Sequence, residues 1–359
     1  MTTETKNSHQ RRVSHWKVYL VGLLVAFFVV FVLSLNLGYA TIPFRDILLI
    51  LGKNVPFLGD TITLPSNLST DATIIMQLRL PRVITGGLVG ACLATAGVIY
   101  QGIFRNPMAD PYVIGAMSGA SLGAALVFVL GIGVSLFGVN TLQIFAFLGS
   151  LVTVLFVYTI SKKGSSVPVT MLLLTGIAVT YFQSAIVTFL QTIASQSVLH
   201  GLTLWFIGSI SDLHGWNDVW SMVPFLIIGF CIAYLYSRDL NIFALGEDQA
   251  RHLGVEIEKV KMVLLVCATL MTAAAVSISG LIGFVGLIIP HLTRIIVGPD
   301  HRILLPTSAM VGAAFLMASD SIARVIMGAA ETPVGVITAF VGGPFFIYLL
   351  RRKSKGYSI

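Results

Sequence analysis

The residues of this chain whose types and spacing could do chemistry gather in one polar segment, residues 237–261, with the sequence SRDLNIFALGEDQARHLGVEIEKVK. Charged residues make up only 10% of the 359 residues, so this segment stands apart from an otherwise apolar chain. Within it, 244–252 predicts a short helix that ends at Gly254, with Glu247 and Arg251 one turn apart as a supporting ion pair. A helix of this length is not stable alone, so we expect it to pack on a partner. We therefore expect this polar segment to bind another protein through its charged side chains.

Three arginines form a second candidate group. Arg79 and Arg82 flank a Leu-Pro pair at the start of an apolar run, and Arg324 follows Asp320 by one helical turn near the end of another. If these ends face outward, arginines there run against the charge bias of membrane proteins, and an acidic partner would explain them. The alternative is that the guanidiniums reach toward water or form a local pair such as Asp320 with Arg324. Spacing alone leaves both interpretations open.

The sequence lacks residue patterns for catalysis or metal binding. No cluster of His, Cys and carboxylate residues has ligand spacing, and we interpret His291, in GFVGLIIPHLTR at 283–294, as a packing residue in preference to a metal ligand. The cysteines, Cys92, Cys231 and Cys267, lie in apolar segments and are interpreted as small core residues. No G-x-x-x-x-G-K sequence followed by Ser or Thr is present, so any ATP must be bound by another subunit.

The elements that position these residues must be membrane-spanning helices. Hydrophobic residues make up 56% of the chain, the mean hydropathy is +0.92, and several apolar runs are long enough to cross about 30 Å of hydrocarbon. We predict ten spans, at 17–37, 80–103, 111–132, 141–161, 169–193, 218–236, 260–280, 281–297, 303–328 and 334–350. The net charge of +7 does not indicate nucleic acid, because in a membrane protein the distribution of Lys and Arg carries the information.

The apolar run at 262–297 decides the number of spans and the orientation. As one helix it would be about 54 Å long, so it must form two spans or a broken helix, and Gly280, Gly283 and Gly286 supply the break. With ten spans and an inner amino terminus, seventeen of the 22 Lys and Arg residues fall on the cytoplasmic side, as the positive-inside rule requires. We therefore expect a cytoplasmic basic tail at 1–16, a single ten-helix transmembrane domain at 17–350 with a cytoplasmic loop at 237–261, and a second cytoplasmic basic tail at 351–359.

An ordered series of motifs resembles a known family. The motifs are RLPR at 79–82, QGIFRNPMADP at 101–111, ALGEDQARHLG at 244–254, GFVGLIIPHLTR at 283–294, DHRILLP at 300–306 and ETPVGVITAFVGGPFFIYLL at 331–350. Together they resemble the permease subunit of iron-siderophore, haem and cobalamin ABC importers. The match runs from about residue 76 to 352, and the first 75 residues resemble the family only in having a first span.

The resemblance implies an all-α, polytopic subunit of the cell membrane with both termini in the cytoplasm. It implies pairing with a second copy or a paralogue, two ATPase subunits inside and a substrate-binding protein outside. ATP and Mg²⁺ would bind the ATPase, and this chain would hold no cofactor and no metal. By motif position, the roles are binding-protein docking for Arg79, Arg82 and Arg324; ATPase coupling for Gly246, Glu247, Ala250, Arg251, Leu253 and Gly254; and a cytoplasmic gate for Val169 and Thr170.

The function we expect is therefore that of a non-catalytic permease for iron-siderophore complexes, with cobalamin or haem as alternative substrates. A rival from another class is an ion-coupled transporter or a channel acting alone, which would require charged residues at mid-membrane that the spans nearly lack. A third possibility is a membrane scaffold whose cytoplasmic helix anchors a soluble partner. The outer segment at 38–76, with Arg45 and Lys53, has no role assigned by these patterns.

Overall fold

Helices make up nearly all of the regular structure in the computed structural model, which describes residues 3–38, 41–56, 59–61, 63–133, 135–136, 139–164, 166–210, 215–327 and 331–354. Side chains at 3–15, 60, 135–136, 349–350 and 352–354 lie outside that description. The helices are α1 (Thr3–Asn36), α2 (Phe44–Lys53), α3 (Ser69–Thr73), α4 (Leu80–Ile103), α5 (Ala116–Leu130), α6 (Thr141–Ser161), α7 (Val169–Ile193), α8 (Gln196–Ile207), α9 (Trp216–Leu235), α10 (Ser237–Phe243), α11 (Glu247–His252), α12 (Ile257–Ser279), α13 (Val285–Val297), α14 (His301–Ile326) and α15 (Val334–Ser354). Two short strands, β1 (Ser135–Leu136) and β2 (Val139–Asn140), pair antiparallel with Leu136 opposite Val139.

The helical membrane architecture predicted from the apolar runs is confirmed. Within the described residues, seven helical segments are long and apolar enough to cross a membrane, namely Trp16–Asn36, Ser66–Ile103, Thr141–Ser161, Val169–Ile193, Trp216–Leu235, Ile257–Ser279 and His301–Ile326. The other three predicted spans coincide with shorter apolar helices, Ala116–Leu130, Val285–Val297 and Val334–Tyr348. Each predicted span thus has a helix, while ten complete crossings remain a prediction. Helices α2, α3, α8 and α10 were not predicted.

The break expected within 262–297 is also confirmed. α12 ends at Ser279, and after an irregular stretch α13 begins at Val285. Gly280 has φ 65°, a backbone conformation that L side chains rarely adopt. A Cβ atom there would lie 2.3 Å from the carbonyl oxygen of Trp205. Gly280 is therefore required at this turn, whereas Gly286 lies inside α13.

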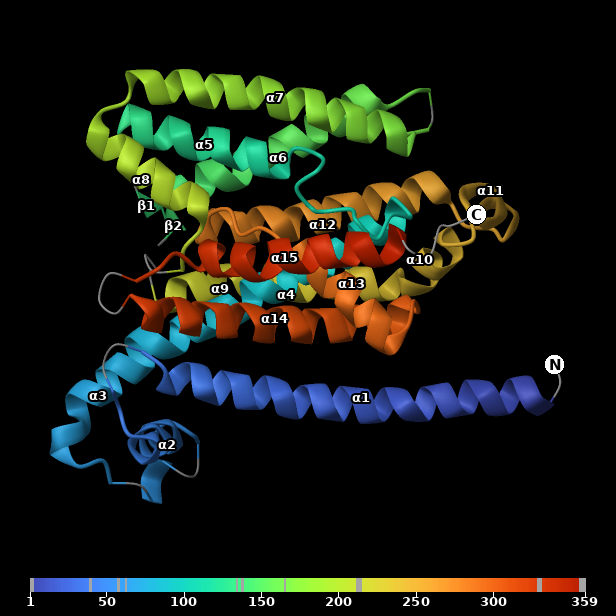
Figure 1. Ribbon diagram of the computed structural model, residues 1–359. Coiled ribbons are helices and arrows are strands. Elements are labelled where there is room, and N and C mark those ends of the chain that lie inside the picture. Colours follow the sequence, from blue (N-terminus) through green and yellow to red (C-terminus); the bar gives the residue numbers. More distant parts are fainter. Residues whose placement is uncertain are drawn as a thin grey trace.

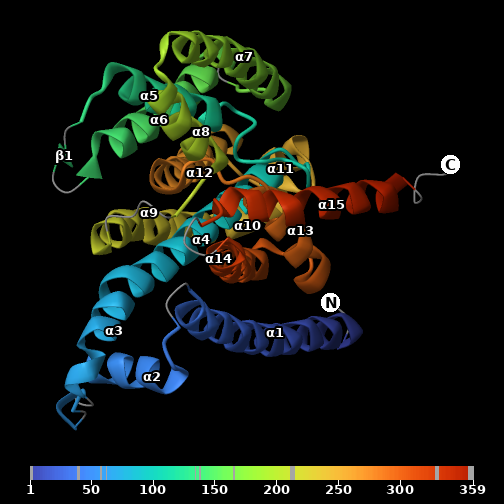
Figure 2. The ribbon, with the colours of Figure 1, turned by 60° about the vertical axis from the view of Figure 1, so that its left-hand side comes forward.

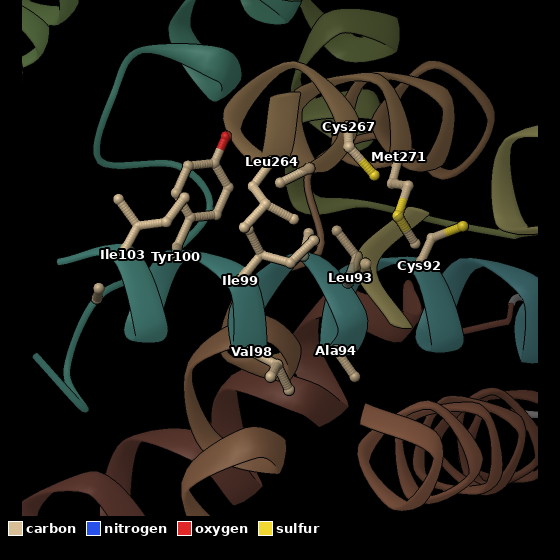
Figure 3. Packing of buried hydrophobic residues seen from close by; sticks show 14 of the residues in the cluster. Cys92, Leu93, Ala94, Val98, Ile99, Tyr100, Ile103, Leu264, Cys267 and Met271 are labelled. Carbon is tan, nitrogen blue, oxygen red and sulfur yellow. The ribbon is translucent and has the colours of Figure 1, made fainter. Parts of the chain in front are cut away.

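The main core is built around α4, which is almost entirely buried and packs against α9, α12, α13 and α14. Figure 3 shows Leu93, Ile99 and Tyr100 of α4 close to Leu264 and Met271 of α12. In a membrane, helix association depends on close van der Waals packing and on satisfied polar groups. A buried hydrogen bond of 3.1 Å between the hydroxyls of Tyr100 and Thr269 fits that requirement. The centre of the bundle is thus fixed by packing without charge.

The cysteines divide between the core and the surface. Cys92 and Cys267 are buried in the main core, as predicted. Cys231 is exposed on α9, so its assignment to the core was wrong. The reason is that α9 is apolar on all sides, and such a helix carries no periodic signal that separates its buried face from its outer face.

The segment between α1 and α4 forms a second, smaller core. α2 buries Ile47 and Ile50 against Leu35 of α1, and the π-helical turn at Ile74–Arg79 adds Ile75. Met317 of α14 joins the same cluster. The long segment that sequence patterns left unexplained therefore packs as a cap on one end of the bundle.

The two ends of the bundle differ in character. In Figures 1 and 2, α1 begins and α15 ends at the end where α10 and α11 lie, and α2 and α3 lie at the opposite end. We call the first the α11 end and the second the α2 end. The start of α1, the end of α15 and the polar segment thus share one side, as the predicted topology requires, and the assignment of that side to the cytoplasm remains a prediction.

Candidate functional site

The polar segment at the α11 end folds as two short helices instead of the single one expected. α10 continues directly from α9, and α11 begins at Glu247, three residues later than predicted. Gly246 separates the two helices with φ 116°, a region that favours glycine. Gly254, with φ 84°, follows the last turn, where its backbone N–H donates to the Arg251 carbonyl at 3.0 Å, so the predicted end is confirmed. Two glycines therefore set the length of α11.

The two faces of α11 have different surroundings. Ala250 is fully buried in the main core and holds the helix against the rest of the chain. Arg251 is exposed, and Leu245 and Leu253, which flank α11, are 57% and 61% exposed. Apolar side chains exposed beside charges, at the polar end of a membrane protein, suit contact with a soluble protein. Of the residues expected to couple to an ATPase, Ala250 is therefore buried, and the others are partly or fully exposed.

Glu247 pairs with a residue that sequence spacing did not indicate. Its carboxylate lies 2.8 Å from the ammonium nitrogen of Lys261 on α12. The i, i+4 spacing had instead predicted an ion pair of Glu247 with Arg251. Glu258 lies 3.6 Å from the same nitrogen. The Lys261 side chain is only 3% exposed, and a buried ammonium requires nearby anionic or polar oxygens. Burial of Lys261 therefore explains why Glu247 turns toward α12.

The predicted gate lies beside this ion pair. We call residues 167–170 the gate segment; it leads into α7, with Pro168 as the residue before the first turn. The backbone N–H of Val167 donates to the Glu258 carboxylate at 3.0 Å, and its carbonyl accepts from Lys261 at 3.5 Å. Val169 is half-buried against the main core, whereas Thr170 is exposed. The structure thus brings Val167, two residues before the first expected gate residue, and Glu247 of the expected coupling helix to the same buried lysine.

Arg82 is the centre of an ion-pair cluster at the α2 end. Its guanidinium lies 2.9 Å from Asp320 on α14 and 2.9 Å from Glu331, which precedes α15. Arg324 lies 3.0 Å from the second oxygen of Asp320, so the alternative of a local Asp320 and Arg324 pair is realised. The side chains of Asp320 and Arg324 are 3% and 4% exposed. Two basic and two acidic residues therefore join α4, α14 and the segment before α15.

Arg79 and Arg324 also make contacts with the end of α1 and the residue that follows it. Arg79 donates to the carbonyl of Leu35 at 3.1 Å, and Arg324 donates to the carbonyls of Ser34 and Leu37 at 3.0 and 2.9 Å. The last carbonyls of a helix lack partners within it and favour positive charge, so two guanidiniums complete the end of α1. Arg79, Arg82 and Arg324 thus all have partners within the subunit. Their docking to a binding protein remains a prediction.

A polar contact that sequence reasoning missed connects α10 to α14. The side chain of Asn241 donates to Asp300 at 2.9 Å and accepts from the backbone N–H of His301 at 2.8 Å. Asp300 caps α14 by accepting from the Arg302 backbone N–H at 3.0 Å. Burial alone would raise the pKa of Asp300, but hydrogen bonds from Arg302 and Asn241 lower it to about 2. The Asp-His-Arg sequence could have indicated the cap; nothing local indicated Asn241.

Metal ligation has no candidate site in the part of the chain that the structure describes, since no three His, Cys, Asp or Glu side chains lie together there. The chemistry that the described residues offer is a set of charge contacts at the two ends of the bundle. Between these ends lies a neutral, tightly packed core.

Both the sequence and the fold of this chain are similar to those of known proteins. Residues 11–352 match the model of the FecCD transport family. The chain is 44% identical over 286 residues to the cobalamin import system permease protein BtuC of Halobacterium salinarum, covering 79% of this chain and 75% of that protein. It is 38% identical over 288 residues to the iron(3+)-hydroxamate import system permease protein FhuB of Bacillus subtilis, covering 80% of this chain and 73% of that protein. A solved structure described as a metal-chelate type ABC transporter in an inward-facing conformation has a TM-score of 0.79 at 32% identity, over 94% of this chain and 99% of that one.

Proposed function

Because the chain belongs to the FecCD transport family, we propose that this multi-pass membrane protein is the permease subunit of an ABC importer that takes up iron-siderophore complexes. The observation that carries the proposal is the family match over 11–352, which includes the α11 end, the gate segment and the arginines of the α2 end. The chain itself is not catalytic in this proposal. ATP and Mg²⁺ bind to a separate ATPase subunit, and this chain supplies the path and the contacts that open and close it.

Cobalamin is the second candidate substrate, because a relative at 44% identity is named for its import. Iron-siderophore complexes are supported by the iron-hydroxamate relative at 38% identity. Both are large metal chelates, and both suit a path without fixed charges. The exposed face of α7 has this character, since Thr170, Leu174 and Tyr181 are exposed there and uncharged.

A second permease subunit, identical or paralogous, would complete that path. Leu174 and Tyr181 of α7 are 58% and 76% exposed in a single subunit, on the same face as Thr170. In a dimer with this face turned toward a two-fold axis, the gate residues of two subunits would oppose each other. Two ATPase subunits would then contact the two copies of α11, and a substrate-binding protein would dock at the α2 end.

The cycle that follows is alternating access driven from another chain. ATP binding moves the ATPase subunits, α11 moves with them, and the gate segment changes which side of the path is open. Such a cycle requires that the two states differ in affinity for nucleotide and for the loaded binding protein. Uncharged gate residues suffice, because a narrow apolar constriction closes by packing and by excluding water.

Reconstitution in vesicles tests the proposal. The chain is inserted with the ATPase and the binding protein from its own operon, and uptake of a ferric hydroxamate or of cyanocobalamin is measured with ATP on the ATPase side. Uptake of one probe that requires both ATP and the binding protein supports the importer and selects its substrate. Flux that needs neither would refute the proposal in favour of a channel or an ion-coupled transporter, and no flux with a fully assembled complex would favour a scaffold.

A further inference from the structure

We propose that Lys261 is the positioning residue that transmits movement of α11 to the gate segment, an inference that rests on the proposed function. Its ammonium nitrogen lies where three elements meet. It is 2.8 Å from Glu247 of α11, 3.6 Å from Glu258 of its own helix α12, and 3.5 Å from the carbonyl of Val167. A lysine ammonium has three donors, and here three oxygens of different elements surround it. Lys261 therefore connects α11, the helix proposed to dock the ATPase, to the start of α7.

Burial makes this contact selective for one arrangement. The Lys261 side chain is 3% exposed, whereas those of Glu247 and Glu258 are 28% exposed. A buried ammonium that loses an anionic partner keeps its desolvation penalty without the compensating attraction. The carboxylate of Glu247, in contrast, gains water readily when α11 moves away. The ammonium thus favours the state in which α11 and the gate segment both lie against α12.

Glu258 makes the contact a relay, because it serves two partners. One carboxylate oxygen accepts the Val167 N–H at 3.0 Å, and the other lies 3.6 Å from Lys261. When Glu247 withdraws with α11, Glu258 is the carboxylate that remains near the buried ammonium among the described residues. Its approach to Lys261 weakens its bond to the Val167 backbone. Displacement of α11 is then transmitted to Val167 through Lys261 and Glu258.

The gate segment is built to follow Val167. Val167 is buried, and the next residue, Pro168, has a ring that restricts φ, here −63°. Val169 and Thr170 come directly after it as the first residues of α7. A shift of the Val167 backbone is therefore passed to Thr170 through a short, stiff connection.

A neighbouring ion pair provides a matched control. Lys259 lies 3.5 Å from Glu256, and these side chains are 62% and 74% exposed. It occupies the same region of the chain and carries the same charge, but a surface pair of this kind contributes little. A Lys259→Met variant removes an equal charge without touching the relay.

The test compares Lys261→Met, Glu247→Gln and Lys259→Met in the reconstituted importer. The readouts are substrate uptake per ATP hydrolysed, and the maleimide accessibility of a Thr170→Cys reporter with Cys92, Cys231 and Cys267 replaced by Ala. We expect Lys261→Met to lower the uptake per ATP by about tenfold, within the range of allosteric coupling energies, and to remove the effect of nucleotide on Thr170→Cys labelling. Lys261→Arg should restore part of the coupling, and the double variant with Glu247→Gln should be no worse than Lys261→Met alone.

Several outcomes would overturn the inference. Coupling and labelling in Lys261→Met that match Lys259→Met would refute it while leaving the importer intact. If Lys261→Met fails to assemble, Glu247→Gln decides, because its side chain is partly exposed and tolerates replacement; unchanged coupling there would refute the relay. Absence of ATP-dependent uptake in the unmodified importer would instead refute the proposed function.

Discussion

Replacing Asp320 by Ala removes the one carboxylate that Arg82 and Arg324 share at the α2 end. Arg82 retains Glu331 at 2.9 Å and is 14% exposed, so Glu331 and water partly compensate Arg82 for the missing Asp320 carboxylate. Among the described residues, the acceptors that remain in contact with Arg324 are neutral, namely the carbonyls of Ser34 and Leu37 and the hydroxyl of Ser321. With 4% of its side chain exposed, its charge is then buried without a carboxylate in direct contact.

The magnitude follows from that difference. Removing one partner of a buried ion pair destabilises a protein by about 3–5 kcal/mol, because the remaining charge stays desolvated. We expect Asp320→Ala to fall in this range, with the cost arising chiefly at Arg324. Adding Arg324→Met should recover part of the loss, because no uncompensated charge then remains, although the end of α1 loses two hydrogen bonds. The two substitutions should therefore be strongly non-additive.

Reversible unfolding in mixed detergent micelles measures this effect. The free energies of unfolding of Asp320→Ala, Arg324→Met and the double variant form a cycle. Glu256→Ala, which breaks the exposed pair with Lys259, is the matched control and should change stability by less than about 0.5 kcal/mol. A loss below about 1 kcal/mol for Asp320→Ala would show that water reaches Arg324, and the argument from burial would be refuted.

Three further substitutions test other parts of the molecule. If the arginines of the α2 end dock an acidic partner, Arg82→Ala should weaken the affinity for the binding protein and reduce the salt dependence of that affinity, since Arg82 is the least buried of the three. Titrations at two ionic strengths measure this, and a salt dependence equal to that of the unmodified protein would contradict the docking role. Because the pKa of Asp300 is lowered to about 2, its contribution to stability is complete above about pH 4 and is lost as the pH falls toward 2. The difference in melting temperature between the unmodified protein and Asp300→Asn should therefore shrink over that interval, and a constant difference would contradict the lowered pKa. Arg251→Pro should disrupt α11, at a cost of about 3 kcal/mol to that helix, and uncouple ATP hydrolysis from uptake while membrane insertion stays normal. Glu247 occupies the first helical position, where Pro is tolerated, so Pro at that position should leave the helix intact. Retained coupling in Arg251→Pro would argue against α11 as the docking element.

The fold was largely predictable because a membrane restricts the options. Apolar runs located a helix for each predicted span, and length alone required the break that Gly280 provides. Motif order identified the family. The amphipathic α2 was missed because its ten residues are too short to cross a membrane, so a search for spans passes over them.

The sites were less predictable, because their partners lie far apart in the sequence. Spacing within one helix indicated Arg324 with Asp320 correctly, but also Glu247 with Arg251 incorrectly. Neither the contact of Arg82 with Asp320, 238 residues away, nor that of Glu247 with Lys261 leaves a local pattern. Helical spacing shows which charges can meet on one helix, and only packing decides which charge is buried and therefore which pair must form.

The distribution of buried charge separates the fixed part of this protein from the parts that can move. α4, α12 and α14 pack in the middle through small and apolar residues, and this packing has one close-fitting arrangement. Charged contacts occur where these helices end: Lys261 at the start of α12, Asp300 before α14, and Asp320 near its far end. Ion pairs can exchange one partner for another as long as each buried charge keeps a counter-charge, whereas a packed core cannot slide without opening voids. A transporter that must open alternately at two ends can therefore keep its centre rigid and place its exchangeable contacts at the ends of its helices.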